Sequence, residues 1–195
     1  MVLGRDMPPT TPLTSWFELR RSSIQGRGAF ALRDIPAGKR LIEYTGERIS
    51  ADEASRRYDD SRAKRHHTFL FELDDERCID AQNIGSDARY INHSCAPNCE
   101  ALQVGRRIFI HSLVAIAKGE ELVYDYQYVV DGPLDAETRK LYACRCGAAT
   151  CRGTIAVARP KKKTKAKTKT ATKKKTSVAA PKKAKRAATK KKVKR

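Results

Sequence analysis

Hydrophobic and polar residues alternate in short runs along residues 15–130 of the chain. Runs of this kind, with a period of two residues, are typical of β-strands that bury one face. They predict strands at residues 16–20, 39–46, 67–73, 77–80, 107–112 and 121–126.

Turn signals separate these runs, at 34–38, 74–75, 104–106 and 117–119, where Gly, Pro or Asp residues gather. Ser50 followed by Glu53 has the form of a capping box, so a short helix is expected to begin there and to reach about Tyr58. The segment 85–90 is too short to assign. Short strands, frequent turns and one modest helix predict a β-rich α+β domain.

The chain has 195 residues, of which 40% are hydrophobic, enough for one domain with a real core. Residues 1–14, rich in Pro and Thr, are expected to form a flexible leader. A folded domain is predicted at 15–135 and a cysteine-containing segment at 136–156. The stretch 157–195 is mostly Lys, Ala, Thr and Pro, so it is predicted to be a disordered basic tail.

Positive charge is concentrated in this tail. Residues 161–195 contain 18 Lys and Arg and no acidic residue, which leaves 23 basic and 22 acidic residues in the first 160. The net charge of +19 therefore belongs almost wholly to the tail. Such a run is either a solvated charge run or a segment that binds nucleic acid by releasing counterions, and its charge density favours binding. The lysines expected to contact nucleic acid include Lys161, Lys162, Lys163, Lys173, Lys174, Lys175, Lys190, Lys191 and Lys192.

Several other classes of protein are excluded or disfavoured by composition. No apolar run approaches the roughly eighteen residues of a membrane span, and the first residues have no apolar segment typical of a secretory signal. Six cysteines without an export signal favour thiols or a metal site over disulfides, which predicts a reducing, intracellular setting. The tail has no aromatic residue, so stacking on single-stranded bases is not indicated.

The sequence Gly26-x-Gly28-x-x-Ala31 has the spacing of a dinucleotide-binding fingerprint. That fingerprint requires a helix to begin at the glycines, within a βαβ unit. Here Pro36 and Gly38 follow and predict a turn and a strand instead. A Rossmann-type interpretation is therefore disfavoured.

Two other segments are more specific, and they begin at Arg89 and at Gly119. The first reads Arg-Tyr-Ile-Asn-His-Ser-Cys-x-Pro-Asn-Cys over 89–99, and the second reads Gly-Glu-Glu-Leu-Val-Tyr-Asp-Tyr over 119–126. In isolation they are a polar loop with a satisfied histidine and an edge strand with alternating aromatic residues. Together they resemble the signature segments of the SET-domain lysine methyltransferases, with Tyr90 where the family has Phe. The resemblance covers about residues 15–155 and includes the glycine motif near the start.

The resemblance implies a SET fold of small sheets with a threaded pseudoknot, in which 119–126 pass beneath the loop of Asn92 and His93. Periodicity alone would not predict this topology, because threaded chains are rare. The implied cofactor is S-adenosylmethionine, converted to S-adenosylhomocysteine. By resemblance its contacts are Arg27, Gly28, Ala29, Arg89, Asn92, His93 and Tyr126.

The resemblance also implies a channel for the target lysine, with Tyr126 as the catalytic tyrosine and with Tyr124 and Tyr44 also assigned to catalysis. The channel is expected to consist of Tyr44, Phe69, Phe71, Tyr124 and Tyr126. The alternative for Phe69 and Phe71 is plain core packing, because alternate residues share one face of a strand. Tyr124 stands at the family's Phe/Tyr switch, which predicts mono- or dimethylation. Phe69 stands where many relatives have tyrosine, and this weakens the prediction of methyl number.

Cys144, Cys146 and Cys151 supply three thiolates, one short of a tetrahedral zinc site. They resemble the family's post-SET segment, and the resemblance implies Cys95 as the fourth ligand of a structural zinc ion. The alternative is an independent zinc knuckle formed by the three clustered cysteines. Cys78 and Cys99 are expected to be buried free thiols.

The sequence therefore predicts an enzyme, a protein-lysine N-methyltransferase acting on a histone or on a histone-like, DNA-associated protein. Its tail resembles those of histone H1 and of bacterial H1-like nucleoid proteins, so nucleic acid is an expected partner and a membrane is not. Two alternatives stay open: an architectural DNA-binding protein with a SET scaffold, and an enzyme that methylates its own tail. The expected location is the bacterial cytoplasm or nucleoid, or chromatin if the protein is eukaryotic or delivered to a host.

Overall fold

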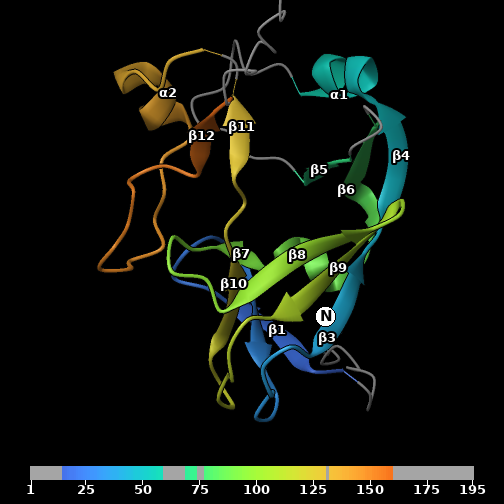
Figure 1. Ribbon diagram of the computed structural model, residues 1–195, viewed down its shortest axis with the longest axis vertical. Helices are drawn as coiled ribbons and strands as arrows, with labels where there is room; N and C mark the ends of the chain where they lie inside the picture. Colours follow the sequence, from blue (N-terminus) through green and yellow to red (C-terminus); the bar gives the residue numbers. More distant parts are fainter. Residues whose placement is uncertain (1–14, 59–68, 74–76, 131, 160–195) are drawn as a thin grey trace, which may run out of the picture. The chain divides into compact units, whose positions relative to one another are not determined.

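The computed structural model describes residues 15–58, 69–73, 77–130 and 132–159 (Figure 1). The leader predicted at 1–14 lies outside the described residues, and so does the tail predicted at 157–195 from residue 160 onward. The predicted start of the tail is wrong, because Val157 and Ala158 belong to a strand. The chain divides into two units, 1–160 and 161–195, and the fold below is that of the first.

The main sheet combines strands that are far apart in sequence, from β1 near residue 17 to β10 near residue 124 (Figure 1). Its strands follow the order β1 (Phe17–Arg21), β2 (Arg27–Ala31), β10 (Glu121–Tyr124), β8 (Cys99–Val104), β9 (Arg107–Ser112) and β3 (Arg40–Tyr44), and the short β7 (Asn92–His93) pairs with β10. The hairpin of β8 and β9 turns at Gly105, whose φ of 60° is the left-handed conformation that glycine adopts without strain. Neighbours distant in sequence thus share one sheet.

Strand β10 lies between β2 on one side and β7 and β8 on the other. It is antiparallel to β2 but parallel to β7 and β8, so it enters the sheet beneath the 92–99 loop. Asn98 fastens that loop: its Nδ2 donates to the Glu121 carbonyl at 2.9 Å, and its Oδ1 accepts from the Val123 amide at 2.9 Å. The threaded SET topology implied by the resemblance is confirmed.

A second sheet has the order β4 (Gly46–Ser50), β6 (Arg77–Gly85), β5 (Leu70–Glu72). The predicted helix is present as α1 (Ala51–Arg57), and the Ser50 hydroxyl accepts from the Glu53 amide at 3.2 Å, as the capping box requires. The strand predicted at 39–46 is two strands, because the chain passes from one sheet to the other at Thr45. A short 3-10 helix, η2 (Asp87–Tyr90), leads into β7.

The C-terminal elements were not predicted. Strands β11 (Tyr128–Val130) and β12 (Ala156–Ala158) form a parallel two-stranded sheet, with helix α2 (Ala136–Leu141) between them in sequence. Asp135 caps α2 by accepting from the Thr138 amide at 2.8 Å. Because α2 buries no residue, it has none of the apolar periodicity by which a helix is detected in sequence. Neither α1 nor α2, the described helices, is long and apolar enough to cross a bilayer.

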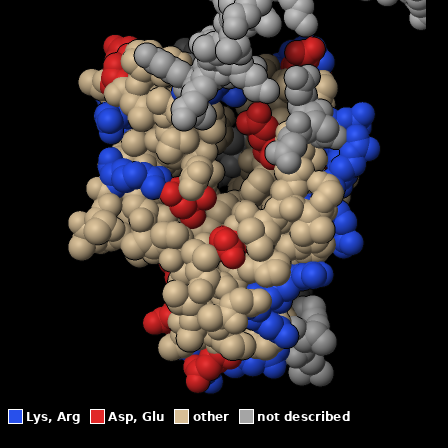
Figure 2. All heavy atoms as spheres, in the orientation of Figure 1, with Lys and Arg blue, Asp and Glu red and all other residues tan. Residues whose placement is uncertain are grey.

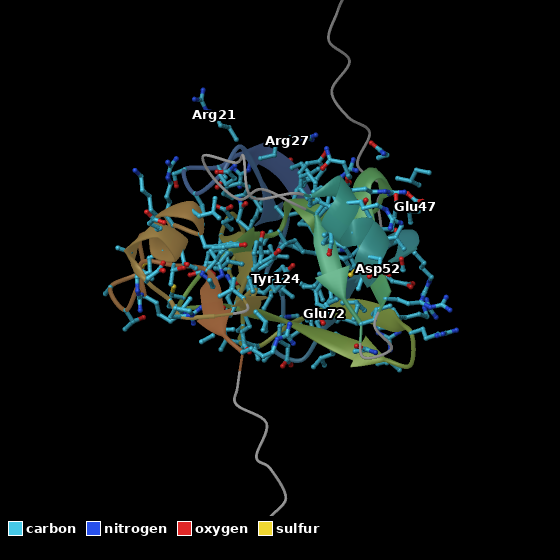
Figure 3. The ribbon with its side chains drawn as sticks, turned by 90° about the horizontal axis from the view of Figure 1, so that it is seen from above. Arg21, Arg27, Glu47, Asp52, Glu72 and Tyr124 are labelled. Carbon is cyan, nitrogen blue, oxygen red and sulfur yellow. The ribbon has the colours of Figure 1, made fainter. Side chains whose placement is uncertain are left out.

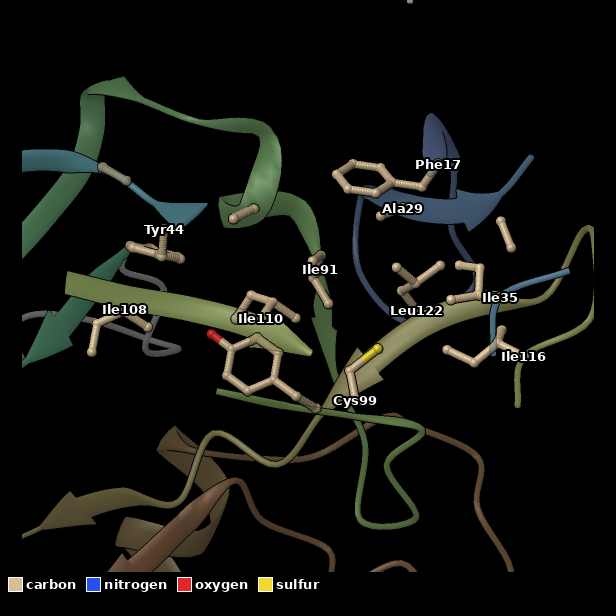
Figure 4. Close-up of a cluster of buried hydrophobic side chains, with 14 of the residues drawn as sticks. Phe17, Ala29, Ile35, Tyr44, Ile91, Cys99, Ile108, Ile110, Ile116 and Leu122 are labelled. Atoms are coloured by element: carbon tan, nitrogen blue, oxygen red, sulfur yellow. The ribbon is translucent and has the colours of Figure 1, made fainter. Parts of the chain in front are cut away.

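The main hydrophobic core lies along the large sheet (Figure 4). Its largest fully buried side chains are those of Ile35, Ile91, Ile108, Ile110, Ile116 and Leu122. Burying an aliphatic side chain of this size stabilises a fold by about 1.5–3 kcal/mol. Tyr44 and Tyr124 belong to the same cluster and are 3% and 7% exposed. The core therefore fixes two aromatic side chains that also face the cavity described next.

Candidate active site

A cavity of about 770 Å³ opens between the C-terminal elements and the β4–β5–β6 sheet. Figure 2 shows this face of the molecule hollowed between the parts that carry α2 and α1, with acidic side chains around the hollow. All seven tyrosines of the chain line the cavity: Tyr44, Tyr58, Tyr90, Tyr124, Tyr126, Tyr128 and Tyr142. The cavity therefore has an aromatic wall that carries many hydroxyl groups.

The centre of this wall is formed by residues from strands that are far apart in sequence. The ring of Tyr124 lies 4.7 Å from that of Tyr126, and Tyr44 lies 5.5 Å from Phe71, measured between ring centroids. Figure 3, seen from above, places Tyr124 between the C-terminal strands and the β4–β5–β6 sheet. The structure thus brings the predicted channel residues of β3, β5 and β10 into one cavity.

Phe69 and Phe71 combine the two roles considered for them. Both pack against the main core cluster, and both line the cavity. The ring of Phe69 lies edge-on to Tyr90 at 6.1 Å, and its main-chain oxygen accepts from the Tyr44 hydroxyl at 2.7 Å. Core packing and a cavity-lining position are therefore compatible here.

The tyrosine hydroxyls at the centre of the wall are held in a defined way. Tyr44 donates to the Phe69 carbonyl at 2.7 Å, and Tyr126 donates to the Ile91 carbonyl at 2.9 Å. Because each hydrogen is used in this way, the oxygen lone pairs stay available as acceptors. Burial raises the pKa of Tyr44, Tyr124 and Tyr126 above the ordinary tyrosine value. These phenols are therefore neutral dipoles at physiological pH.

Tyr124 differs from Tyr44 and Tyr126 in the hydrogen bonding of its hydroxyl. Its hydroxyl makes no hydrogen bond with any residue of the described ranges, although the ring is buried and the residue lines the cavity. The group is thus free to bind water or a ligand.

The loop that carries Asn92 and His93 forms another part of the lining. The Asn92 Nδ2 donates to the Arg27 carbonyl at 3.0 Å and to Glu121 Oε1 at 2.8 Å, and the Gln25 carbonyl lies 3.3 Å away. His93 Nδ1 accepts from the Tyr126 amide at 3.2 Å. Burial lowers the pKa of His93 to about 4, so the imidazole is neutral at physiological pH.

Two arginines flank Tyr90 at the cavity. The guanidinium carbons of Arg27 and Arg89 lie 4.7 and 4.9 Å from the centre of its ring. Arg89 Nη1 donates to the Ala81 carbonyl at 2.7 Å. Arg89 Nε is buried and has no hydrogen-bond partner in the part of the chain that the structure describes. A buried donor without an acceptor is unusual, so this nitrogen calls for a partner that the described chain does not supply.

Gly28 and Ala29 do not line the cavity, whereas Gln25, Gly26 and Arg27 do. A Cβ atom on Gly28 would collide with the carboxylate of Glu121 and would lie 2.9 Å from Ser22 Cβ. Glycine is therefore required at this position by a neighbouring side chain. The family resemblance had instead placed Gly28 among the cofactor contacts.

Cys95, Cys144, Cys146 and Cys151 converge, with all four sulfur atoms within 4.8 Å of one another. Cys95 Sγ and Cys144 Sγ are 3.8 Å apart. A tetrahedron with zinc–sulfur bonds of about 2.3 Å has sulfur–sulfur edges of about 3.8 Å. Burial raises the pKa of Cys95 and Cys144, whereas hydrogen bonds from neighbouring main-chain and thiol groups outweigh burial at Cys146 and lower its pKa to about 6. The donor set and its spacing fit a structural zinc ion. Cys78 and Cys99 are buried free thiols, as predicted.

Several contacts at the site were not predicted. Arg152 binds Asp125 through both carboxylate oxygens, at 2.6 and 2.8 Å, and its main-chain amide lies 3.4 Å from Cys95 Sγ. Tyr128 and Tyr142 stack at 5.1 Å between ring centroids. The alternation Tyr124, Tyr126, Tyr128 is a signal that could have extended the predicted aromatic wall to Tyr128. The tail lysines predicted to bind nucleic acid lie outside the described residues.

Comparison with known proteins gives a family match over most of this site. Residues 26–127 match the SET domain family. The histone-lysine N-methyltransferase trr of Drosophila melanogaster is 43% identical over 138 residues, which cover 69% of this chain and 6% of that protein. The human histone-lysine N-methyltransferase 2B is 40% identical over 139 residues, which cover 68% of this chain and 5% of that protein. The chain thus spans a small fraction of the length of these relatives.

A solved structure is similar as well. It is the crystal structure of KRYPTONITE in complex with mCHG DNA and SAH, with a TM-score of 0.56 and 32% sequence identity. The alignment covers 71% of this chain and 28% of that one. The similarity therefore concerns one part of a longer protein.

Proposed function

The chain belongs to the SET-domain family, and we propose that it is a protein-lysine N-methyltransferase that uses S-adenosylmethionine. The observation that carries the proposal is the aromatic cavity, in which Tyr44, Tyr124 and Tyr126 stand beside the Asn92–His93 loop. Relatives named histone-lysine N-methyltransferases and a similar structure that contains SAH support it.

The residues at one end of the cavity fit the cofactor. S-adenosylmethionine, when bound, supplies a methyl group on a positively charged sulfur and carries a carboxylate and an ammonium group. Arg27 and Arg89 offer positive charge for the carboxylate, and the buried Arg89 Nε is a donor without an acceptor in the described chain. Asn92 also lines the cavity and offers an amide. We assign these residues, with His93 and Tyr126, to cofactor binding.

The aromatic end of the cavity fits a lysine side chain. A lysine ammonium has an ordinary pKa near 10.4 and must lose a proton before its nitrogen can attack a methyl group. An apolar wall lowers that pKa, because burial disfavours the charged form. The oxygens of Tyr44 and Tyr126 accept hydrogen bonds from the amine and align its lone pair. Since these tyrosines are neutral, they act by orientation and desolvation, and the proton leaves to solvent.

We propose that the products are mono- or dimethyl-lysine, because of the free hydroxyl of Tyr124. A hydroxyl that holds water or the amine leaves less room for a methylated nitrogen. Tyr124→Phe should shift the product toward higher methylation while total turnover changes by less than about threefold, well below the effect of a lost catalytic group. Mass spectrometry of a methylated lysine peptide measures the shift. An unchanged product distribution would contradict this role.

We further propose that the four cysteines hold zinc and so close the C-terminal segment over the cavity. The proposed substrate is a histone or a histone-like protein. The lysines of 161–195 are proposed to bind nucleic acid, which would bring the enzyme to chromatin or to a bacterial nucleoid. Deleting 161–195 should lower activity on DNA-bound substrate and leave activity on a free peptide unchanged.

The proposed reaction is tested with isotope-labelled S-adenosylmethionine and core histones, an H1-like protein, or the enzyme alone. The wild-type chain should transfer label to lysine, and Tyr126→Phe should lower the rate at least about a hundredfold, as expected when the reacting nitrogen loses its alignment. Calorimetry with S-adenosylhomocysteine and the melting temperature serve as controls for binding and folding of the variant. No transfer and no cofactor binding by the wild-type chain would overturn the proposal.

A further inference from the structure

Glu121 occupies a junction behind the cavity wall. It is the first residue of β10, half-buried, and it does not itself line the cavity. Its Oε1 accepts from Asn92 Nδ2 at 2.8 Å, and its Oε2 accepts from the Ser22 hydroxyl at 3.0 Å. The side chain therefore connects the turn after β1 with the loop that carries Asn92.

The surrounding main chain is arranged around this carboxylate. Gly28 leaves the space that the carboxylate fills, since a Cβ there would collide with it. The Ser22 hydroxyl also accepts from the Ile24 amide at 3.0 Å, and the Ser22 amide donates to the Gly26 carbonyl at 2.9 Å. The 22–26 turn is thus closed on itself and bonded to Glu121.

This arrangement determines the orientation of the Asn92 amide. All three groups near Nδ2 are oxygens: the carbonyls of Gln25 and Arg27 and the carboxylate of Glu121. A reversed amide would place Oδ1 against these acceptors, so it is disfavoured. In the observed orientation Oδ1 has no hydrogen-bond partner among the described residues, and Asn92 is one of the residues that line the cavity.

We propose that Glu121 is a positioning residue: it holds the Asn92 amide so that Oδ1 accepts a hydrogen bond from the ammonium group of the cofactor. This inference rests on the proposed function. An amide oxygen suits an ammonium donor and repels a carboxylate, whereas Arg27 and Arg89 suit the carboxylate. The two charged groups of the cofactor are therefore separated by the chemistry of the lining.

The test compares two ligands by calorimetry on the full chain. They are S-adenosylhomocysteine and its analogue in which hydrogen replaces the α-amino group. The wild-type chain should bind the first at least about tenfold more tightly, as expected for a charge-assisted hydrogen bond. Glu121→Ala should reduce this preference to about threefold or less, mainly by weakening the amino-bearing ligand.

Two matched variants identify the cause. Glu121→Gln keeps an oxygen acceptor for Asn92 and should retain most of the preference. Glu120→Ala removes the adjacent carboxylate, which is exposed and accepts from the Ala117 amide, and should leave both affinities unchanged. If Glu121→Ala does not fold, Ser22→Ala replaces it in the test, because it removes one of the two side-chain contacts of the Glu121 carboxylate. Ser22→Ala should lower the ratio of the two ligand affinities at least about twofold.

A Glu121→Ala variant that keeps the full preference, or that loses both ligands equally, overturns the inference. In the second case the side chain only supports the fold. If the wild-type chain binds neither ligand, the proposed function fails and this inference fails with it. The two failures are thus distinguishable.

Discussion

The two sides of the cavity are held together by different means. The strands of the large sheet share one extended core, in which Ile91, Ile110 and Leu122 are completely buried. The C-terminal side has a small cluster of Val130, Tyr142 and Ala156, with the cysteine cluster next to it. One side thus has an extended apolar core, and the other has a small apolar cluster beside the four cysteines that we propose to hold zinc. The difference separates a stable scaffold from a segment whose order we expect to depend on metal.

The largest expected effect is that of metal removal. A chelator, or Cys146→Ser, should abolish slowed amide hydrogen exchange across 142–158, because the small C-terminal cluster cannot hold these residues alone. Exchange in β1, β2 and β9 should stay slow. Hydrogen exchange read by mass spectrometry distinguishes the two sides.

Cys99→Ala is the matched control, because Cys99 is buried in the main core and lies outside the cysteine cluster. It should leave the zinc content unchanged. After metal removal, an equal rise in exchange at 142–158 and in the large sheet, or no rise in either, would contradict the proposal that only the C-terminal side depends on metal.

A substitution in the core of the large sheet should instead lower the stability of the whole fold. Ile110 is 0% exposed, so Ile110→Ala should lower the free energy of unfolding by about 2–5 kcal/mol. Ile84 is 73% exposed, and Ile84→Ala should change the free energy of unfolding by less than about 0.5 kcal/mol. Urea unfolding followed by fluorescence of Trp16 measures both. A small effect of Ile110→Ala would mean that the large sheet is not the stabilising part.

The smallest expected effect concerns the contact between the two sides. Arg152 belongs to the C-terminal segment and binds Asp125, which adjoins the catalytic candidate Tyr126. Arg152→Met should retain zinc and lower kcat/KM by about twofold to fivefold, because a partly exposed ion pair contributes about 1 kcal/mol or less. Arg139→Met is the control, since the side chain of that exposed arginine donates to the Leu134 carbonyl and makes no ion pair with another residue that the structure describes. Equal kcat/KM for wild type and Arg152→Met would show that the pair does not position the site.

The same pair has a defined pH dependence. Burial would raise the pKa of Asp125, but hydrogen bonds from Arg152 and the Gln127 amide outweigh it and lower that pKa below its ordinary value of 3.8. Because the pKa of Asp125 is lower in the folded state, its ionised carboxylate contributes its full stabilisation at pH values above the ordinary pKa. This stabilisation is lost as the pH falls through the lowered pKa of the folded state. The pair should therefore be intact across the neutral range.

Much of the fold was predictable from local signals. Alternating runs, glycine turns and the Ser50 capping box correspond to β9, β10 and α1, although β10 ends two residues earlier than predicted. Strands β11 and β12 have three residues each, too short for a periodic pattern. The order of the strands was not predicted, and the threading of 119–126 was implied only by the family resemblance, because pairing between distant segments leaves no local trace.

The candidate site likewise contains residues that could be predicted and contacts that could not. The channel tyrosines and the fourth zinc ligand, Cys95, were predicted from the family resemblance, and the structure brings them together with their expected neighbours. Ser22 and Glu121 were missed because 99 residues separate them in sequence, and Arg152 and Asp125 because 27 do. No pattern within one segment reports such a contact.

The central claim is that cofactor and lysine meet in the cavity enclosed by the two sides. A crystal structure of the full chain with zinc, S-adenosylhomocysteine and a lysine peptide tests it directly. We predict the cofactor amino acid group beside Asn92, the lysine nitrogen among Tyr44, Tyr124 and Tyr126, and zinc bound by the four cysteines. A cofactor or lysine bound outside the aromatic cavity would contradict the account.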